Sequence, residues 1–137
     1  MNEESRVRDF AVRYSAAWCS RDPAAVAQFF APEGSLTING GIPAVGRVAI
    51  AAEARNFMTA FPDLRVTMNK LVFRRDRVEF HWTLDGHNTG RGGAGKHVRI
   101  SGFEEWKIGR EGLIAESQGH FDAGEYQRQI DYGASAG

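Results

Sequence analysis

Apolar and polar residues alternate from Leu64 almost to the end of the chain, which is the pattern of β-strands with one buried face. Before Leu64, the apolar residues instead recur every three or four positions, which is the pattern of amphipathic helices. This change of period predicts helices first and a sheet second. It favours an α+β domain in which the helices gather on one face of an antiparallel sheet.

Three N-terminal helices are predicted, the first over Glu3–Ser20 and the third over Arg47–Ala60. The second begins at Pro23, with Asp22 as its N-cap, and carries Phe29 and Phe30 on its buried face until Ala31-Pro32 stops it. A short strand is predicted over residues 34–38, before the turn signal Asn39-Gly40-Gly41. A closing helix capped by Asp122 follows the last strand.

The sheet is expected to bend. The apolar phase slips near Asn69-Lys70, which predicts a β-bulge. Two long strands then form a hairpin from Val98 to Asp122, with a tight turn at residues 109–112. A bent sheet closed on one side by helices is cone-shaped, and its interior can hold a ligand. All 137 residues are expected to form this single domain.

The composition narrows the class of function. Seventeen basic and seventeen acidic residues cancel, so no global field favours nucleic acid or an anionic membrane as a partner. No apolar run is long enough to span a bilayer, and the N-terminus does not resemble a signal peptide. The single cysteine, Cys19, allows no internal disulfide and suits a reducing compartment. A cytoplasmic location is therefore expected.

Glu104 is the principal candidate for chemistry. Alternation places it on the same strand face as Ile100, Gly102, Trp106 and Ile108, which is the face expected to be buried. Burial raises the pKa of a carboxyl group, and a carboxyl titrating near neutrality can act as a general acid or base. The alternative is a structural carboxyl whose oxygens accept hydrogen bonds from a tyrosine or tryptophan.

Other residues are predicted to surround Glu104. The inward face of the last strand is expected to carry Leu113, Ala115, Ser117, Gly119 and Phe121, and its small residues would leave room for a cavity. Tyr14, Trp18 and Trp82 are candidates for the walls, and the Tyr14 hydroxyl could also stabilise an oxyanion. His120 points outward by parity, and it could carry a proton only if a bulge turned it inward.

No metal site is expected. His81, Asp85 and His87, with Glu79, alternate along one outer strand face and could in principle hold a metal ion. Side chains two residues apart on a strand are too widely separated to complete a coordination shell without help from a neighbouring strand. A solvated or dimer-facing strand is the favoured interpretation.

Several motifs together resemble the nuclear-transport-factor-2-like (cystatin-like) superfamily, and within it the polyketide-cyclase (SnoaL-like) group. The motifs are Tyr14-Ser-Ala-Ala-Trp-Cys-Ser-Arg-Asp-Pro23, Phe29-Phe-Ala-Pro32, Phe61-Pro-Asp-Leu64, Trp82-Thr-Leu-Asp-Gly-His-Asn-Thr-Gly90, Ile100-Ser-Gly102 and Gly112-Leu-Ile-Ala-Glu116. The resemblance implies a conical pocket, a homodimer formed through the outer sheet face, and no cofactor.

The resemblance also suggests roles for single positions. The acid/base aspartate of the cyclases corresponds to Gly119, and a histidine on the preceding strand corresponds to Trp106. The acidic residue two positions earlier is retained as Glu104, and a pocket-mouth histidine corresponds to Asn88. The aldol-cyclase mechanism therefore lacks its usual acid at Gly119, and Glu104 becomes the candidate for any chemistry.

The expected ligand is a small, largely apolar molecule. Trp18, Trp82 and Trp106 would form the walls around it, with Asn88 as a polar contact at the rim. The catalytic hypothesis is a cofactor-free isomerisation, cyclisation or hydration with Glu104 as the proton carrier. Two alternatives are a ligand-binding domain without catalysis and a dimeric interaction domain of the same fold.

Overall fold

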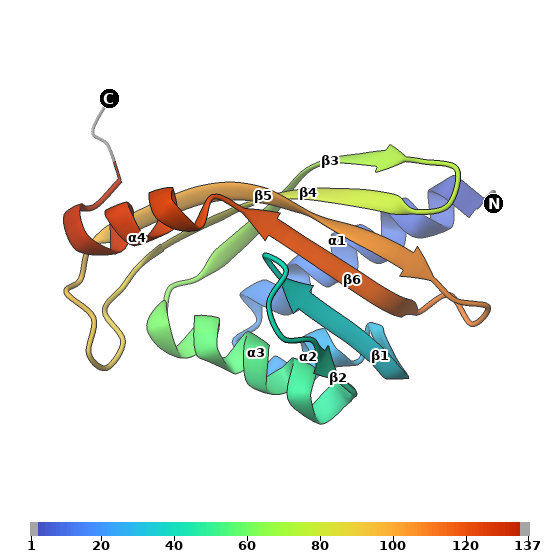
Figure 1. Ribbon diagram of the computed structural model, residues 1–137, viewed down its shortest axis with the longest axis horizontal. Coiled ribbons are helices and arrows are strands. Elements are labelled where there is room, and N and C mark those ends of the chain that lie inside the picture. The colour runs from blue at the N-terminus through green and yellow to red at the C-terminus, as the bar shows by residue number, and fades with distance from the viewer. Residues whose placement is uncertain (1–2, 135–137) are drawn as a thin grey trace.

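The computed structural model describes residues 3–134, which form a curled sheet covered by helices (Figure 1). The helices are α1 (Glu3–Cys19), α2 (Pro23–Ala27), α3 (Arg47–Ala60) and α4 (Ala123–Tyr132). The strands are β1 (Phe30–Ile38), β2 (Ala44–Val45), β3 (Arg65–Phe73), β4 (Val78–His87), β5 (His97–Ile108) and β6 (Ile114–Phe121). The predicted α+β class is confirmed, and three helices precede the four strands that follow residue 64.

The sheet has the strand order β2-β1-β6-β5-β4-β3. The four strands that follow residue 64 pair antiparallel with their neighbours, as the alternating pattern predicts. Strand β1 joins them by pairing parallel to β6, and this long-range contact was not indicated by the sequence. The hairpin β5–β6 is therefore central in the sheet, with a strand on each side.

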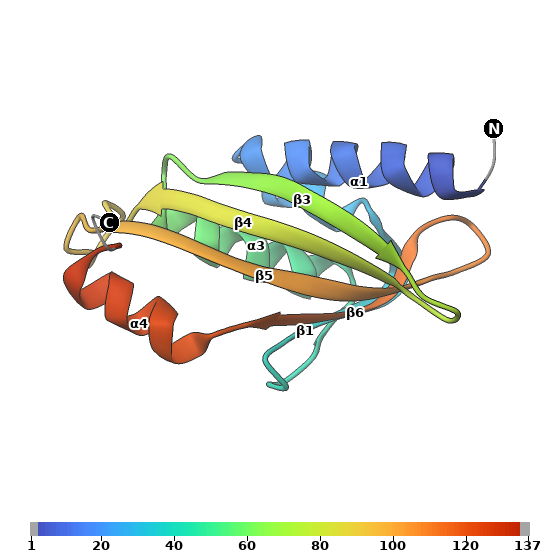
Figure 2. The ribbon, with the colours of Figure 1, turned by 90° about the horizontal axis from the view of Figure 1, so that it is seen from above.

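Helices α1 and α3 pack on one face of the sheet, and α4 lies at one end of it (Figures 1 and 2). The apolar stripe of α1 is buried against the sheet, including Phe10, Tyr14 and Trp18. The loop that joins β4 to β5 lies at the same end of the sheet as α4. This arrangement gives the sheet an inner face under the helices and an outer face on the other side.

The second helix is shorter than predicted. Asp22 caps it as expected, accepting a hydrogen bond from the Ala24 amide at 3.1 Å, but α2 ends at Ala27. Phe30 lies in β1 opposite Ile114 and is fully buried there. The prediction that Phe29 and Phe30 are helical is wrong because pairing with β6 outweighs local helical periodicity. Pro32, which has no amide hydrogen to donate, falls where the β1–β6 register is interrupted.

Two bulges set the direction of side chains near the centre of the sheet. The predicted bulge in β3 is confirmed by a register shift between Met68 and Lys70. A second register shift, opposite Lys107 and Ile108, lies at the start of β6. It turns Ile114 inward and leaves Ala115 exposed, so the prediction that Ala115 shares the inward face with Ser117 is wrong. Leu113 precedes β6 and is half-buried against the core.

Candidate functional site

Glu104 lies in the middle of β5 on the inner face of the sheet. Its strand neighbours are Phe80 on β4 and Gly119 on β6. Val98, Ile100 and Trp106 are buried on the same face, which confirms the predicted alternation. The residue is only 7% exposed, so its carboxyl group is held inside the protein.

Three neutral donors contact the Glu104 carboxyl. Ser117 Oγ donates to Oε1 at 2.7 Å, and Trp106 Nε1 donates to the same oxygen at 3.0 Å. The Tyr14 hydroxyl lies 3.0 Å from Oε1 and 3.2 Å from Oε2. The donors come from β6, β5 and α1, so tertiary packing assembles the site.

The two carboxyl oxygens therefore have different surroundings. Oε1 accepts from Ser117 and Trp106 and is also nearer to Tyr14. Within residues 3–134, the longer contact with the Tyr14 hydroxyl is the one hydrogen bond that Oε2 accepts. An indole N–H can only donate, so Oε1 is fixed as an acceptor. Oε2 is consequently the oxygen with capacity left for a proton or a ligand.

Burial raises the pKa of Glu104 above its ordinary value, and hydrogen bonds from Ser117, Trp106 and Tyr14 oppose that rise. No ion pair to Glu104 is found within residues 3–134, so no cation offsets the cost of burying its charge. Burial and the nearby carboxylate also hold the pKa of Tyr14 well above its usual range. The tyrosine therefore stays protonated and remains a donor.

Packed aromatic rings hold these donors in place. The Trp106 ring stacks on Phe80, with ring centroids 4.9 Å apart and an angle of 12° between the planes. Tyr14 meets Trp106 edge to face at 5.2 Å, and Phe10 does so at 5.6 Å. Such contacts orient the rings as well as burying them. The hydrogen-bonding atoms around Glu104 thus sit on a rigid support.

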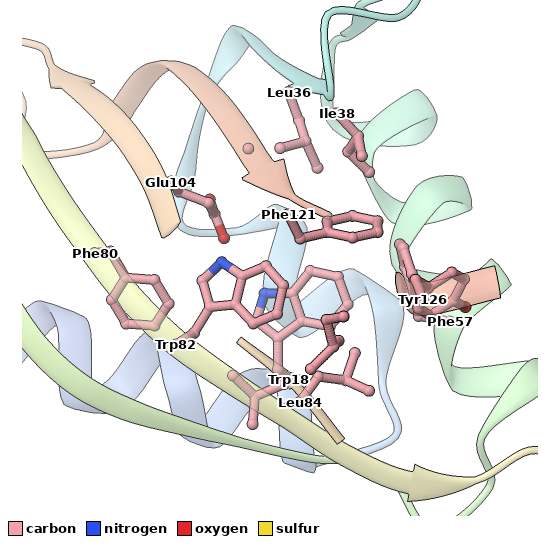
Figure 3. A pocket seen from close by; sticks show the side chains of 13 residues that line it. Trp18, Leu36, Ile38, Phe57, Phe80, Trp82, Leu84, Glu104, Phe121 and Tyr126 are labelled. Carbon is pink, nitrogen blue, oxygen red and sulfur yellow. The ribbon is translucent and has the colours of Figure 1, made fainter. Parts of the chain in front are cut away.

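Glu104 lines a cavity, and Figure 3 shows its carboxyl pointing toward the Trp82 indole ring. The cavity has a volume of about 60 Å³. It is lined by Trp18, Leu36, Ile38, Phe57, Val66, Phe80, Trp82, Leu84, Ile100, Glu104, Gly119, Phe121 and Tyr126. A cavity needs about 10–15 Å³ to hold one water molecule, so this cavity has room for a small organic group. The site is therefore an apolar cavity with one carboxyl group in its wall.

Sequence comparison gives the family of this chain. A family model described as SnoaL-like polyketide cyclase matches residues 8–130. The chain belongs to the SnoaL-like polyketide cyclase family. No curated protein matches the chain by sequence.

Solved structures with the same fold are distant in sequence from this SnoaL-like protein. A SnoaL-like polyketide cyclase from Jannaschia sp. CCS1 is 14% identical, with a TM-score of 0.80 over 95% of this chain and 94% of that one. A protein of ketosteroid isomerase-like fold from Catenulispora acidiphila, in complex with trimethylamine, is 19% identical, with a TM-score of 0.77 over 92% and 98%. The epoxide hydrolase/cyclase-like enzyme SalBIII is 16% identical, with a TM-score of 0.78 over 91% and 97%. These similarities establish the fold.

The predicted site residues fall into three groups in this SnoaL-like protein. Trp18, Trp82 and Gly119 line the cavity together with Glu104. Tyr14, Trp106 and Ser117 lie behind the carboxyl, where they hold it and do not line the cavity. The sequence placed this second group among the substrate contacts, and its alternative of a carboxyl that accepts from a tyrosine or a tryptophan matches the hydrogen bonds of Tyr14 and Trp106. Alternation could place Trp106 and Ser117 on the inward strand face with Glu104, but it could not distinguish a residue that lines the cavity from one that holds the carboxyl.

Asn88 and His120 are the third group, and neither lines the cavity. Asn88 is buried in the β4–β5 loop, where its backbone carbonyl accepts from the Gly95 amide at 2.8 Å. His120 lies on the outer sheet face, and its Nε2 is 3.0 Å from a carboxylate oxygen of Glu105. The bulge in β6 precedes Ser117, so it does not turn His120 inward. The structure therefore separates both residues from Glu104.

Several cavity residues were missed as site residues. Phe57 lies on α3, and Phe121 lies at the end of β6, where the sequence placed it on the inward face without a ligand role. Tyr126 lines the cavity because α4 folds over the end of the sheet and packs its ring against Phe121 at 5.4 Å. The direction of a terminal helix depends on tertiary contacts, so no local signal identified Tyr126.

The histidines of the outer face contact carboxylates. His81 lies 3.0 Å from Glu79, His87 lies 2.7 Å from Asp63, and His97 lies 3.0 Å from Asp85. Within residues 3–134, no group of three or more histidine, cysteine, aspartate or glutamate side chains is arranged to hold a metal ion. None of the helices in that range is both long enough and apolar enough to cross a lipid bilayer.

Proposed function

We propose that this protein binds a small, largely apolar molecule in the cavity and carries out cofactor-free acid/base chemistry on it, with Glu104 as the proton carrier. Isomerisation, cyclisation and hydration are the reaction types that one carboxyl group in such a cavity can support. The observation that carries the proposal is the position of Glu104, which is buried without a cation at the wall of an apolar cavity.

The arrangement of donors supports a defined role for each oxygen. Ser117 and Trp106 hold Oε1, so the carboxyl cannot rotate freely. Oε2 is left to take a proton from a bound molecule and to return it. The raised pKa makes the carboxylate a stronger base than an exposed glutamate. In an isomerisation, Oε2 would remove a proton from one carbon and deliver it to another, so that no net proton is consumed.

The comparisons support a small-molecule ligand. The Catenulispora acidiphila protein of this fold was crystallised with trimethylamine, and SalBIII is described in the formation of a pyran ring. This chain has Gly119 where the cyclase resemblance would place an aspartate, so the chemistry is assigned to Glu104 on the neighbouring strand. A shared fold alone would not justify the assignment, and the geometry around Glu104 provides its basis.

The experiment uses a probe that does not require the natural substrate. Cyclohexanone is incubated with the protein in D₂O, and exchange of its α-hydrogens is followed by ¹H NMR. Glu104→Gln should preserve the fold and slow the catalysed exchange by about 10²–10⁴-fold, since the proton carrier is lost. Glu105→Gln is the matched control, because Glu105 is the adjacent residue on the outer face.

Equal exchange rates in the wild-type protein and Glu104→Gln would overturn the assignment of Glu104. Absence of catalysed exchange in the wild-type protein, with cyclohexanone still shifting the resonances of Trp18 and Trp82, would favour the alternative of a ligand-binding domain. That alternative has one observation in its favour, which is that three donors already stabilise the Glu104 carboxyl.

The protein is further proposed to be a single-domain, cytoplasmic homodimer that uses no cofactor and pairs through its outer sheet face. Phe103 supports the choice of face, because it is a half-buried aromatic residue between two histidines. Its ring centroid lies 5.1 Å from that of His81 and 4.8 Å from that of His120. Sedimentation of the wild-type protein and of Phe103→Lys would test this, with dissociation expected for the variant. A Phe103→Lys protein that remains dimeric would exclude the face.

A further inference from the structure

The cavity carries an unbalanced negative charge when Glu104 is ionised. Glu104 is the one acidic side chain among the lining residues, and no lysine, arginine or histidine is among them. The groups that contact its carboxyl are the neutral donors of Tyr14, Trp106 and Ser117. Neutral donors stabilise a carboxylate, but they leave its net charge in place. A ligand with a positive charge would supply the counterion for Glu104 that the lining residues do not provide.

Aromatic rings make up much of the remaining wall. Six aromatic side chains line the cavity, namely Trp18, Phe57, Phe80, Trp82, Phe121 and Tyr126. The faces of aromatic rings are electron-rich and attract ammonium groups, and tryptophan does so most strongly. Figure 3 shows the Trp82 indole ring beside the Glu104 carboxyl and the Tyr126 ring farther from it. A group seated beside the carboxylate would therefore also contact tryptophan.

We propose that the ligand of this cavity is a small organic cation, in which an alkylammonium group pairs with Oε2 of Glu104 and packs against Trp18 and Trp82. The inference rests on the proposed use of the cavity as the ligand site and specifies the chemical class of the ligand. The apolar substituents of the ammonium group would contact the remaining lining residues, including Leu36 and Leu84.

Other charge classes fit the cavity less well. An anionic ligand would face the Glu104 charge with no basic residue lining the cavity to offset the repulsion. A neutral ligand would gain the apolar contacts, but it would leave the buried carboxylate without a counterion. A cation gains the same apolar contacts and the ion pair, so it should be preferred over a neutral molecule of the same shape.

The test compares two molecules of nearly equal shape, choline and its neutral isostere 3,3-dimethylbutan-1-ol. Binding of each to the protein is measured at pH 8 by titration calorimetry and by the shifts of the tryptophan indole resonances. Choline should bind about tenfold or more tightly than the isostere. Glu104→Gln should remove this preference, whereas Glu105→Gln should retain it because Glu105 lies on the outer face.

A second variant separates the aromatic contribution from the ion pair. Trp82→Leu keeps the wall apolar but removes a ring face, and it should weaken choline more than the isostere. If Trp82→Leu does not fold, Trp82→Phe gives the same comparison with a smaller expected difference, since phenylalanine is the weaker partner for a cation.

Equal affinities of choline and the isostere for the wild-type protein would overturn the cation inference, as would an unchanged preference in Glu104→Gln. In that outcome, binding of the isostere would leave the proposed function intact. Binding of neither molecule would count against both the cation inference and the cavity as the ligand site. Choline binding that survives in Glu104→Gln but is lost in Glu105→Gln would place the cation on the outer face and would also overturn the inference.

Discussion

Glu104 and Glu105 are adjacent in the chain but lie on opposite faces of one strand. Glu104 is buried under the helices and contacts three neutral donors. Glu105 lies on the outer face, where Arg77 Nε is 3.2 Å and His120 Nε2 is 3.0 Å from its carboxylate. Among the described residues, the glutamate on the inner face thus contacts no cation, whereas the glutamate on the outer face contacts two basic side chains.

The two faces differ in the same way elsewhere. On the outer face, Arg74 and His81 lower the pKa of Glu79 below its ordinary value. On the inner face, burial raises the pKa of Glu104. The outer carboxylates are therefore ordinary ion-pair partners, while Glu104 is the group whose proton affinity is changed in the direction useful for acid/base chemistry. An acidic residue on a strand is thus informative about function only when its face is known.

Replacing Glu104 or Glu105 by alanine should give the largest difference in stability between the inner and the outer face. Glu104→Ala removes the acceptor of the Ser117 and Trp106 donors, and each buried donor left unsatisfied costs about 1–3 kcal/mol. We expect its free energy of unfolding to fall by at least about 2 kcal/mol. Glu105→Ala removes partly exposed ion pairs and should cost about 1 kcal/mol or less. Urea unfolding at pH 7 measures both, and equal losses would contradict the contrast between the faces.

Replacing a serine by alanine on each face, Ser117 on the inner face and Ser101 on the outer face, should give a smaller difference in stability. Ser117→Ala removes the 2.7 Å hydrogen bond to Glu104 and should cost about 1–2 kcal/mol. It should also raise the pKa of Glu104 further, because that hydrogen bond opposes the rise caused by burial. Ser101→Ala removes a 2.7 Å contact with Thr83 on the outer face and should cost about 0.5 kcal/mol. NMR titration of the Glu104 carboxyl carbon would read the pKa, which Ser101→Ala should leave unchanged.

The smallest expected effect is a difference in the pH dependence of stability. The pKa of Glu104 is raised in the folded state, so its contribution to stability falls as pH rises from its unfolded pKa of about 4.3 to the folded value. The pKa of Glu79 is lowered, so its contribution is lost as pH falls from the unfolded pKa of about 4.3 toward the folded value.

Glu104→Gln should therefore remove a loss of stability that occurs as pH rises above about 4.3. Glu79→Gln should remove a loss of stability that occurs as pH falls below about 4.3. Urea midpoints measured from pH 3 to pH 8 for the wild-type protein and both variants would show this. Slopes of the same sign for the two glutamates would exclude the assigned shifts.

Alternation and turn chemistry predicted much of the local structure. The period change at Leu64, the bulge near Asn69, the cap at Asp122 and the inward position of Glu104 all followed from side-chain spacing, and the structure agrees with each. The parallel β1–β6 pairing and the early end of α2 could not be predicted in this way. They depend on contacts between residues far apart in the chain, and such contacts override weak local preferences.

The candidate site, like the fold, could be predicted from the sequence only in part. The sequence by itself determined that a glutamate would lie on an apolar strand face, because side chains alternate along any regular strand. Only the tertiary structure decided that Tyr14, Trp106 and Ser117 would donate to that glutamate, and that Tyr126 would help to line the cavity. The residues that hold Glu104 come from three elements, and their distances depend on how the helices pack against the curled sheet. That packing minimises exposed apolar surface over the whole chain, so no local segment of sequence encodes it.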